Sequence, residues 1–175
     1  MKPKFFKFFL LAVMAILFIN ASALADKPIQ ISLFNPVQIF PESESITGIR
    51  WNIIYGKNSS LTGIDFGLVN QLSGSMTGLQ YGLVGIVDRN FSGWQDAFVG
   101  ITKGNFTGLQ TCFYGRVHRG TGLQWGFINS ADKMEGLQVG FVNYTVTLEG
   151  LQVGLINIIK QGGAFPVFPI VNWSF

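Results

Sequence analysis

Glycine recurs in this 175-residue chain at an almost constant interval, and this periodicity limits the possible folds more than any other feature. The interval is 15 residues in the first four steps and 14 in the last three. The glycines that open the eight units are Gly48, Gly63, Gly78, Gly93, Gly108, Gly122, Gly136 and Gly150. Tandem units of this length each form one supersecondary element, so residues 48–161 are expected to fold as a series of similar pieces.

Other positions of the unit are also restricted when they are counted from its glycine. The first residue is large and apolar in all eight units, the fourth is small in seven, and two apolar residues follow. The second residue is glutamine in the last six units, at Gln80, Gln95, Gln110, Gln124, Gln138 and Gln152. Arg50 and Asp65 take this place in the first two units. The seventh residue is asparagine or glycine in seven units, with asparagine at Asn70, Asn129, Asn143 and Asn157. Charged residues collect in the variable remainder of the unit.

The pattern within each unit predicts β-structure. A helix would lose about 1 kcal/mol, relative to alanine, at each of the two or three glycines in a unit. Apolar first, third and fifth residues around a polar second one have the two-residue period of a strand with one buried face. We therefore expect an all-β fold.

Near-identical consecutive units favour a parallel β-solenoid, in which each unit forms one coil and equivalent positions stack about 4.8 Å apart. Glycine and asparagine at fixed offsets would then adopt the positive-φ corner conformations that other residues reach only at a cost. Stacked Gln and Asn side chains would form amide ladders between coils. On this basis, Gly140→Val is expected to destabilise a corner by forcing a positive φ on valine.

A small antiparallel outer-membrane β-barrel with about one strand per unit is the alternative architecture. It is favoured by a charged content of only 12%, an aromatic content of 14%, and the aromatic C-terminal strand that ends in Phe175, as in bacterial outer-membrane barrels. Against it, three poor strand formers would lie within each strand. The two sets of turns in a barrel also need not resemble each other, whereas these units do. The solenoid is therefore the preferred prediction.

The two ends of the chain depart from the repeat. Residues 1–25 contain three lysines, an apolar run and the small-x-small sequence Ala23-Leu24-Ala25, which indicates a secretory signal peptide. Residues 26–47 are expected to form a strand and a loop that cap the first unit, and residues 162–175 an aromatic strand at the other end. Without the signal, nine of the 12 Lys and Arg residues remain against nine Asp and Glu residues, so charge does not favour a nucleic-acid partner.

Few residues have the chemistry for catalysis or metal binding. Asp65 and Asp96 are the only acidic residues on strand-like segments, but they occupy different offsets, and Asp65 is expected to face the surface in place of a glutamine. His118 is expected in a solvated turn without neighbouring metal ligands. Cys112 stands at a small-residue position without a predicted activating base, so we expect a structural filler. We predict no enzymatic activity, no cofactor and no metal site.

The partners indicated by the sequence belong to the cell envelope. A row of aromatic residues recurs at the third position, at Trp51, Phe66, Tyr81 and Trp125. Such a row can bind a sugar or a peptide, but it more often packs a core or lies against lipid, so a small-molecule ligand is not expected. The basic cluster of Arg116, His118 and Arg119 could contact lipid phosphate. We expect outer-membrane lipid or an envelope protein as the partner, and the sequence indicates no oligomeric state.

The G-L-Q-x-G-L-V-N units, exemplified by residues 136–143 and 150–157, resemble the leptospiral-type surface-repeat family of exported bacterial proteins. The resemblance covers residues 48–157, and the first unit departs most, with Arg50, Asn52 and Tyr55 at the Gln, Gly and Asn positions. It implies export and association with the outer membrane or cell surface, with the periplasm as the other location, but no residue-specific activity. The resulting hypothesis is an exported, non-enzymatic envelope protein that provides a structural or interaction scaffold. A barrel that acts as an anchor or narrow pore is the alternative.

Overall fold

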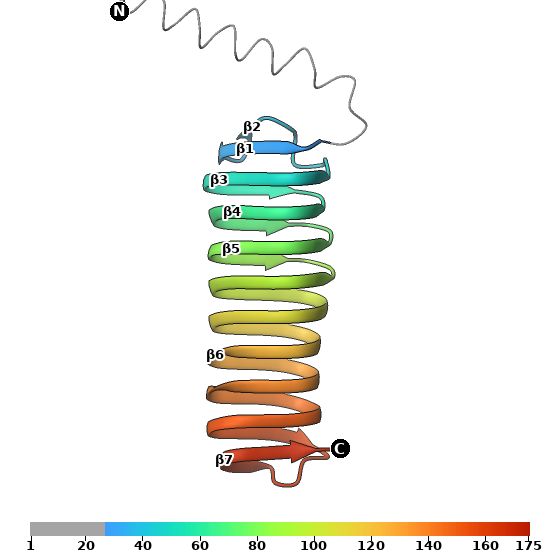
Figure 1. Cartoon of the computed structure of the whole chain (residues 1–175), viewed down its shortest axis with the longest axis vertical. Coiled ribbons are helices and arrows are strands. Elements are labelled where there is room, and N and C mark those ends of the chain that lie inside the picture. Colours follow the sequence, from blue (N-terminus) through green and yellow to red (C-terminus); the bar gives the residue numbers. More distant parts are fainter. Residues whose placement is uncertain (1–26) are drawn as a thin grey trace, which may run out of the picture.

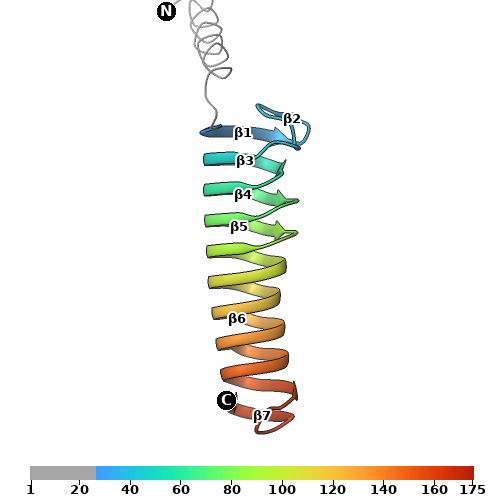
Figure 2. The same ribbon diagram turned by 90° about the vertical axis from the view of Figure 1, so that its right-hand side faces the viewer.

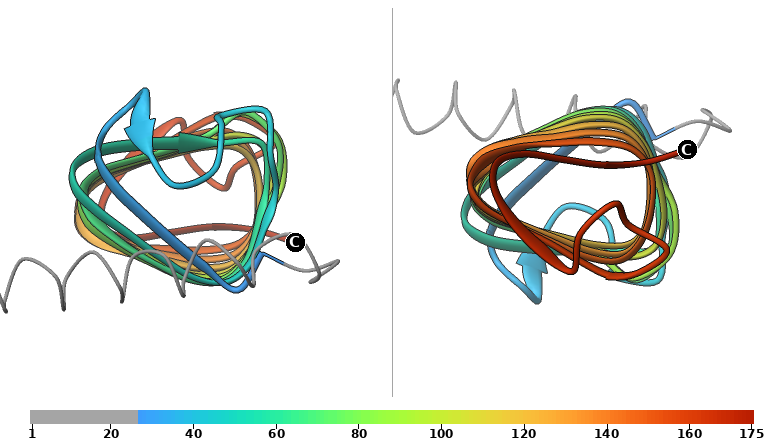
Figure 3. Two further views of the ribbon diagram at one scale, coloured as in Figure 1. Left: turned by 90° about the horizontal axis from the view of Figure 1, so that it is seen from above. Right: turned by 90° about the horizontal axis from the view of Figure 1, so that it is seen from below.

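The computed structural model describes residues 27–175, which wind into a straight rod of stacked coils (Figures 1 and 2). The coils superpose in a view along the rod and enclose an interior that side chains fill (Figure 3). The signal peptide expected over residues 1–25 lies outside the described residues. No helix in residues 27–175 has the length and hydropathy of a membrane span.

Seven strands form one sheet in the order β2-β1-β3-β4-β5-β6-β7. Their bounds are β1 Ile29–Phe34, β2 Val37–Gln38, β3 Ile46–Asn58, β4 Leu61–Leu72, β5 Met76–Val87, β6 Phe91–Gln161 and β7 Val167–Ser174. Each of β3, β4 and β5 belongs to one repeat unit. β6 runs without interruption through the last five units, so its coils turn corners while keeping strand hydrogen bonding.

Neighbouring coils run parallel, with equivalent residues side by side. Gly63 pairs with Gly48 on one side and with Gly78 on the other, and Gly93 pairs with Gly78. The same register continues through β6, where each second-position glutamine contacts the glutamine one unit earlier. The prediction of an all-β parallel solenoid is confirmed. The antiparallel barrel alternative is wrong, because every unit runs in the same sense and therefore forms a coil.

The glycine that opens each unit occupies a position that only glycine fits. Its φ lies between 124° and 141° in all eight units, a region that L side chains rarely adopt. A Cβ at Gly122 would also overlap the carbonyl oxygen of Gly108 in the adjacent coil. The recurring glycine therefore permits both the local backbone conformation and the close approach of successive coils.

The fourth and seventh residues of the unit do not adopt the positive-φ corner conformation expected from the sequence. Neither Gly140 nor Asn143 has a positive φ, and Ile170 is the one non-glycine residue within 27–175 that does. Glycine is needed at position 140 for space, because a Cβ there would overlap the carbonyl oxygen of Gly126. The expected cause of a Gly140→Val defect is therefore wrong, and steric overlap replaces backbone strain.

Side chains alternate along each coil, but the buried face is not the apolar one that we expected. Gln80 and Gln124 at the second position are fully buried, whereas Trp51 and Trp125 at the third position are 63% and 61% exposed. The fourth residue decides the direction, because the adjacent coil leaves no room there for a large side chain. Because side chains alternate along a strand, the second residue points to the same side as the fourth, which is the inside. The first, third and fifth residues therefore point outward.

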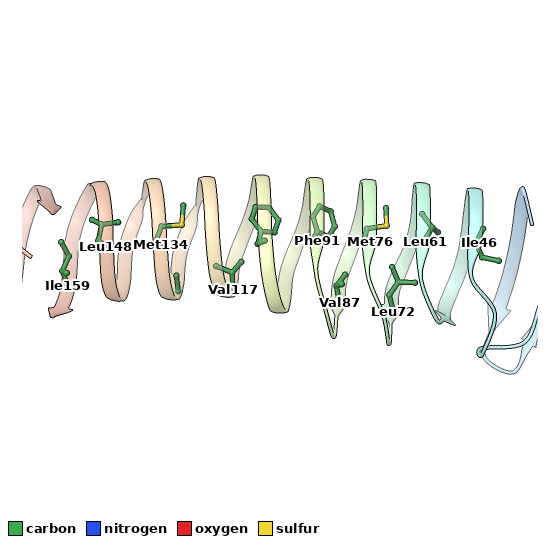
Figure 4. Packing of buried hydrophobic residues seen from close by; sticks show 12 residues of the cluster. Ile46, Leu61, Leu72, Met76, Val87, Phe91, Val117, Met134, Leu148 and Ile159 are labelled. Atoms are coloured by element: carbon green, nitrogen blue, oxygen red, sulfur yellow. The ribbon is translucent and has the colours of Figure 1, made fainter. Parts of the chain in front are cut away.

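The hydrophobic part of the interior is formed by two other columns (Figure 4). The first lies two residues before the repeat glycine and contains Ile46, Leu61, Met76, Phe91, Phe106, Met134 and Leu148. The second lies nine residues after that glycine and contains Leu72, Val87, Val117, Ala131 and Ile159. Stacking continues within the columns, since the rings of Phe91 and Phe106 have centroids 5.3 Å apart. Burial of these side chains stabilises the stack along its whole length.

Non-repeating segments extend the sheet at both ends. β1 pairs in parallel with β3, and Phe40 packs against the hydrophobic columns. β7 folds back and pairs antiparallel with the last coil of β6, with Trp173 opposite Leu151. The first coil holds one extra residue, because the register shifts after Asn52. Gly56 therefore aligns with Asn70, and Tyr55 does not occupy the asparagine position that sequence counting gave it.

Candidate functional site: the buried ladders and the outer face

The second-position glutamines form one buried ladder along the rod. From Gln152 back to Gln95, each side-chain Nε2 donates to the Oε1 of the glutamine one unit earlier, at 2.7–2.8 Å, and Gln80 is the last acceptor. A second N–H reaches a backbone carbonyl, as from Gln110 to Gly100 at 3.3 Å. Each of these amides has hydrogen-bond partners, and the Oε1 of the last one, Gln152, is the ladder oxygen left without a donor among the described residues. The pairing matters because an unpaired buried polar group costs about 1–3 kcal/mol. The ladder therefore fixes the register of one coil on the next.

A buried ion pair continues this ladder at its N-terminal end. Arg50 donates from Nε and Nη2 to the two carboxylate oxygens of Asp65, at 2.8 and 2.7 Å. Gln80 donates to the same carboxylate at 2.9 Å, and the remaining guanidinium nitrogen of Arg50 reaches the Gln71 carbonyl at 3.0 Å. Neither Arg50 nor Asp65 is exposed. The expectation that Asp65 faces the surface is wrong, because the second position is an inward one.

The seventh position forms a second, interrupted ladder. Asn129 donates to Asn143, and Asn143 donates to Asn157, each at 2.8 Å. At the other end, Asn52 donates to Asn70 at 2.8 Å from the fourth position of the first unit. The intervening units have glycine at the seventh position, at Gly85, Gly100 and Gly115. The sequence-predicted structural positions are thus brought together as two stacks of amides on the inner wall.

Cys112 fills space that glycines leave in the interrupted part of this ladder. A Cβ at Gly100 would overlap the Cys112 sulfur, so the thiol lies where a seventh-position side chain would otherwise extend. Burial raises the pKa of the Cys112 thiol to about 12. A thiol with such a pKa is protonated at neutral pH and is a poor nucleophile.

The outside of the coils presents an almost continuous apolar surface, which we call the outer face. It consists of the first, third and fifth residues of every unit. The first residues are Ile49, Ile64, Leu79, Trp94, Leu109, Leu123, Leu137 and Leu151. The third are Trp51, Phe66, Tyr81, Asp96, Thr111, Trp125, Val139 and Val153, and the fifth are Ile53, Leu68, Leu83, Phe98, Phe113, Phe127, Phe141 and Leu155. β1 adds Ile29 and Ile31 at one end, and β7 adds Val171 and Trp173 at the other.

Part of the outer face is a regular aromatic stack. Phe98, Phe113, Phe127 and Phe141 follow one another with ring centroids 4.7–4.9 Å apart and interplanar angles of 1–7°. Each of these rings is between 43% and 53% exposed. The spacing of the coils fixes the distance between successive rings, so this surface is preorganised.

An open hollow of about 660 Å³ interrupts the outer face near its middle, where Asp96 and Thr111 replace larger third-position residues. Tyr81 and Trp125 line it on the two flanking coils. Thr111 accepts a hydrogen bond from the indole of Trp94 at 2.8 Å. Asp96 faces outward and Asp65 inward, so the two carboxylates lie on opposite sides of the wall and do not form a catalytic pair.

Apart from Asp96 on the outer face and the buried pair of Arg50 and Asp65, the charged residues of the repeat units gather in the variable part of the unit. Arg116 and His118 both contact Asp132 of the following coil, at 2.9 and 2.7 Å. The hydrogen bond with His118 and the nearby Arg116 charge lower the pKa of the Asp132 carboxyl. His118 is thus a strand residue with an acidic neighbour, and not an isolated turn residue as expected. Within residues 27–175, no group of three or more His, Cys, Asp or Glu residues could hold a metal ion.

Sequence reasoning missed two of these contacts, although a signal for both was present. Arg50 and Asp65 stand at the same offset in consecutive units, and so do His118 and Asp132. In a parallel stack, residues at the same offset are neighbours. Opposite charges at equal offsets therefore predict contacts between coils.

Comparison of the chain with protein-family models, curated proteins and solved structures finds no match to any of them.

Proposed function

We propose that this chain is an exported, non-enzymatic repeat protein of the bacterial cell envelope, whose solenoid provides a rigid scaffold with an interaction surface. One observation carries the proposal: a preorganised outer face, apolar except for Asp96 and Thr111 at its middle, runs the length of the rod, and the surface ion pairs lie away from it. Contiguous exposed apolar patches beyond a few hundred Å² mark interaction surfaces in proteins. The function therefore lies in what the rod contacts.

The internal structure supports a mechanical role. The coils are joined by backbone pairing and by hydrogen bonds between second-position side chains, which are glutamines in the last six units and Arg50 and Asp65 in the first two. Such a stack resists bending at any single coil, because a local opening breaks buried amide contacts on both sides. A stiff element of fixed length is what a scaffold requires.

The sequence supports export. Residues 1–25 combine a basic start, an apolar run and a small-x-small sequence, which is the organisation of a secretory signal. The resemblance of the units to leptospiral-type surface repeats favours the outer membrane or cell surface over the periplasm. A protein of the envelope is the partner class that fits this face, with outer-membrane lipid as the alternative.

Cell fractionation tests this proposal. A C-terminally tagged chain expressed in a Gram-negative bacterium is expected in the envelope fraction, with a mass that corresponds to a mature protein beginning at Asp26. A matched variant that lacks residues 8–19 is expected to keep Met1 and to remain in the cytoplasm. Full-length, unprocessed protein in the cytoplasm of cells that express the intact chain would contradict the proposal.

A further inference from the structure

We propose that the outer face is a homodimer interface, in which a second copy of this chain packs face to face and antiparallel, with Asp96 and Thr111 at its centre. This inference concerns the partner of the outer face and does not depend on where the protein is located.

The size of the outer face matches what a stable dimer needs. It presents eight rows of three outward side chains, and β1 and β7 each add one row. Ten rows at a spacing of about 4.8 Å give a flat surface roughly 43 Å long. Stable protein interfaces use roughly 20–30 residues on each partner, and flat sheets stack about 10 Å apart. One copy of the same face supplies a surface of the required extent.

The third-position column is self-complementary when one copy is reversed. The ten rows have their midpoint between the units of Asp96 and Thr111, so a two-fold axis there places Asp96 opposite Thr111 of the second copy. Trp51 then lies opposite Val153, and Phe66 lies opposite Val139. Large side chains thus meet small ones towards both ends. A parallel arrangement would instead oppose Trp51 to Trp51 and leave two valines facing each other.

The fifth-position column has the opposite gradient and leads to the same pairing. It is aliphatic in the first three units and aromatic in the next four, from Phe98 to Phe141. Reversal places Leu68 opposite Phe141 and Leu83 opposite Phe127 of the second copy. Towards both ends, each column therefore opposes large side chains to smaller ones, as close packing favours. Near the middle, Tyr81 faces Trp125, and Phe98 faces Phe113 beside the smaller pair of Asp96 and Thr111.

The polar residues at the midpoint favour a protein partner over lipid. Asp96 lies in the middle of the outer face, where a bilayer would leave its carboxylate without a hydrogen-bond donor at a large cost. In the antiparallel dimer it faces the hydroxyl of Thr111 from the second copy. The open hollow between Tyr81 and Trp125 leaves room there for these polar groups and water.

Analytical ultracentrifugation of the purified chain without detergent tests the dimer. The wild-type chain is expected to dimerise at micromolar concentration, and Leu83→Glu is expected to raise the dissociation constant at least tenfold. Ile156→Glu, a matched change at an exposed residue outside the outer face, is expected to leave it unchanged. Circular dichroism establishes that each variant is folded. A monomeric wild-type chain, or a Leu83→Glu chain that dimerises normally, overturns the proposal.

Spin labels test the orientation in a Cys112→Ala background. Labels at Asp96→Cys are expected to show dipolar broadening, because the two copies of this residue lie in adjacent rows. Labels at Val153→Cys are expected roughly 35 Å apart, since seven rows of about 4.8 Å separate them in the antiparallel dimer. Short distances at both sites mean a parallel dimer and overturn the proposal. Flotation of a monomeric chain with phosphatidylethanolamine–phosphatidylglycerol vesicles, abolished by Leu83→Glu, makes the face a lipid surface and also overturns it.

Discussion

The carboxylate of Asp65 accepts hydrogen bonds from Nε and Nη2 of Arg50 inside the solenoid, where neither side chain is exposed. At this contact, the direction of hydrogen-bond donation along the ladder reverses. Every glutamine of the ladder donates towards the N-terminal end of the rod, and Gln80 donates to Asp65 in the same direction. A carboxylate has no N–H with which to continue, so Asp65 ends the chain of donors and Arg50 donates to it from the other side. The pair therefore closes the ladder with each side-chain nitrogen of Arg50 and each carboxylate oxygen of Asp65 in at least one hydrogen bond.

Removal of only the carboxylate is expected to be strongly destabilising. Asp65→Gln leaves the Arg50 guanidinium buried without its counter-charge, and breaking a buried pair in this way costs about 3–5 kcal/mol. The free energy of unfolding from urea titration measures the loss. The double variant Arg50→Gln/Asp65→Gln extends the ladder by two glutamines and is expected to recover at least half of the lost stability. A cost below about 1 kcal/mol for Asp65→Gln would falsify a structural role for the pair.

The glutamine ladder predicts different costs for the same substitution at two positions. Gln110→Leu leaves the Gln95 Oε1 without its donor and the Gln124 amide without its acceptor, at about 1–3 kcal/mol for each group. Gln152 is the last member, and its own Oε1 has no hydrogen-bond partner in the described part of the chain. Both variants also lose one bond to a backbone carbonyl, of Gly100 or of Ile158. Within the ladder, Gln152→Leu leaves only the Oε1 of Gln138 without its partner, so it is expected to cost less than Gln110→Leu in urea unfolding. Equal losses of unfolding free energy for the two variants would mean that the hydrogen bonds between neighbouring glutamines do not stabilise the stack.

The sequence predicts the stacking well because the repeat spacing determines which residues lie side by side. Equal offsets in consecutive units become neighbours in a parallel stack, which is why the glutamine and asparagine columns follow directly from the spacing. The direction of each side chain was harder to predict, because strict alternation is compatible with either face inside. The fourth-position glycines indicate which side of the strand faces the interior, as at Gly140, where the carbonyl of Gly126 excludes a Cβ. Charged residues usually face water, and for this reason the sequence predicts an exposed Asp65.

The repeat glycines allow backbone strain to be separated from steric overlap. Gly122→Ala forces alanine into a φ of 124° and drives its Cβ into the carbonyl of Gly108. Gly162 also has a positive φ, of 74°, but no atom lies within 4 Å of a Cβ built there. Gly162→Ala is expected to cost about 1–2 kcal/mol from conformation alone, and Gly122→Ala several kcal/mol. Thermal unfolding of the two variants checks the difference, and similar melting temperatures would show that the coils can separate to accept a methyl group.

Acid titration tests the contacts of Asp132. Its carboxyl pKa is lowered from the ordinary value of 3.8 by the hydrogen bond with His118 and by the Arg116 charge. A carboxyl group with a depressed pKa in the folded state contributes stability above its unfolded pKa, and this contribution is lost as the pH falls through the folded value. The unfolding free energy of the wild-type chain should therefore exceed that of Asp132→Asn at pH 6, and the difference should shrink below pH 4.

The size of this difference is limited by solvent. The side chains of Arg116 and Asp132 are 41% and 37% exposed, so screening keeps the contribution of the pair below about 1 kcal/mol. Sodium chloride at high concentration is expected to reduce the difference further, because it screens exposed charges. Urea titrations at pH 3, 4 and 6, with and without salt, measure both effects. A difference between the wild-type chain and Asp132→Asn that stays the same at pH 3 and pH 6 would mean that the carboxylate charge does not stabilise this side of the rod.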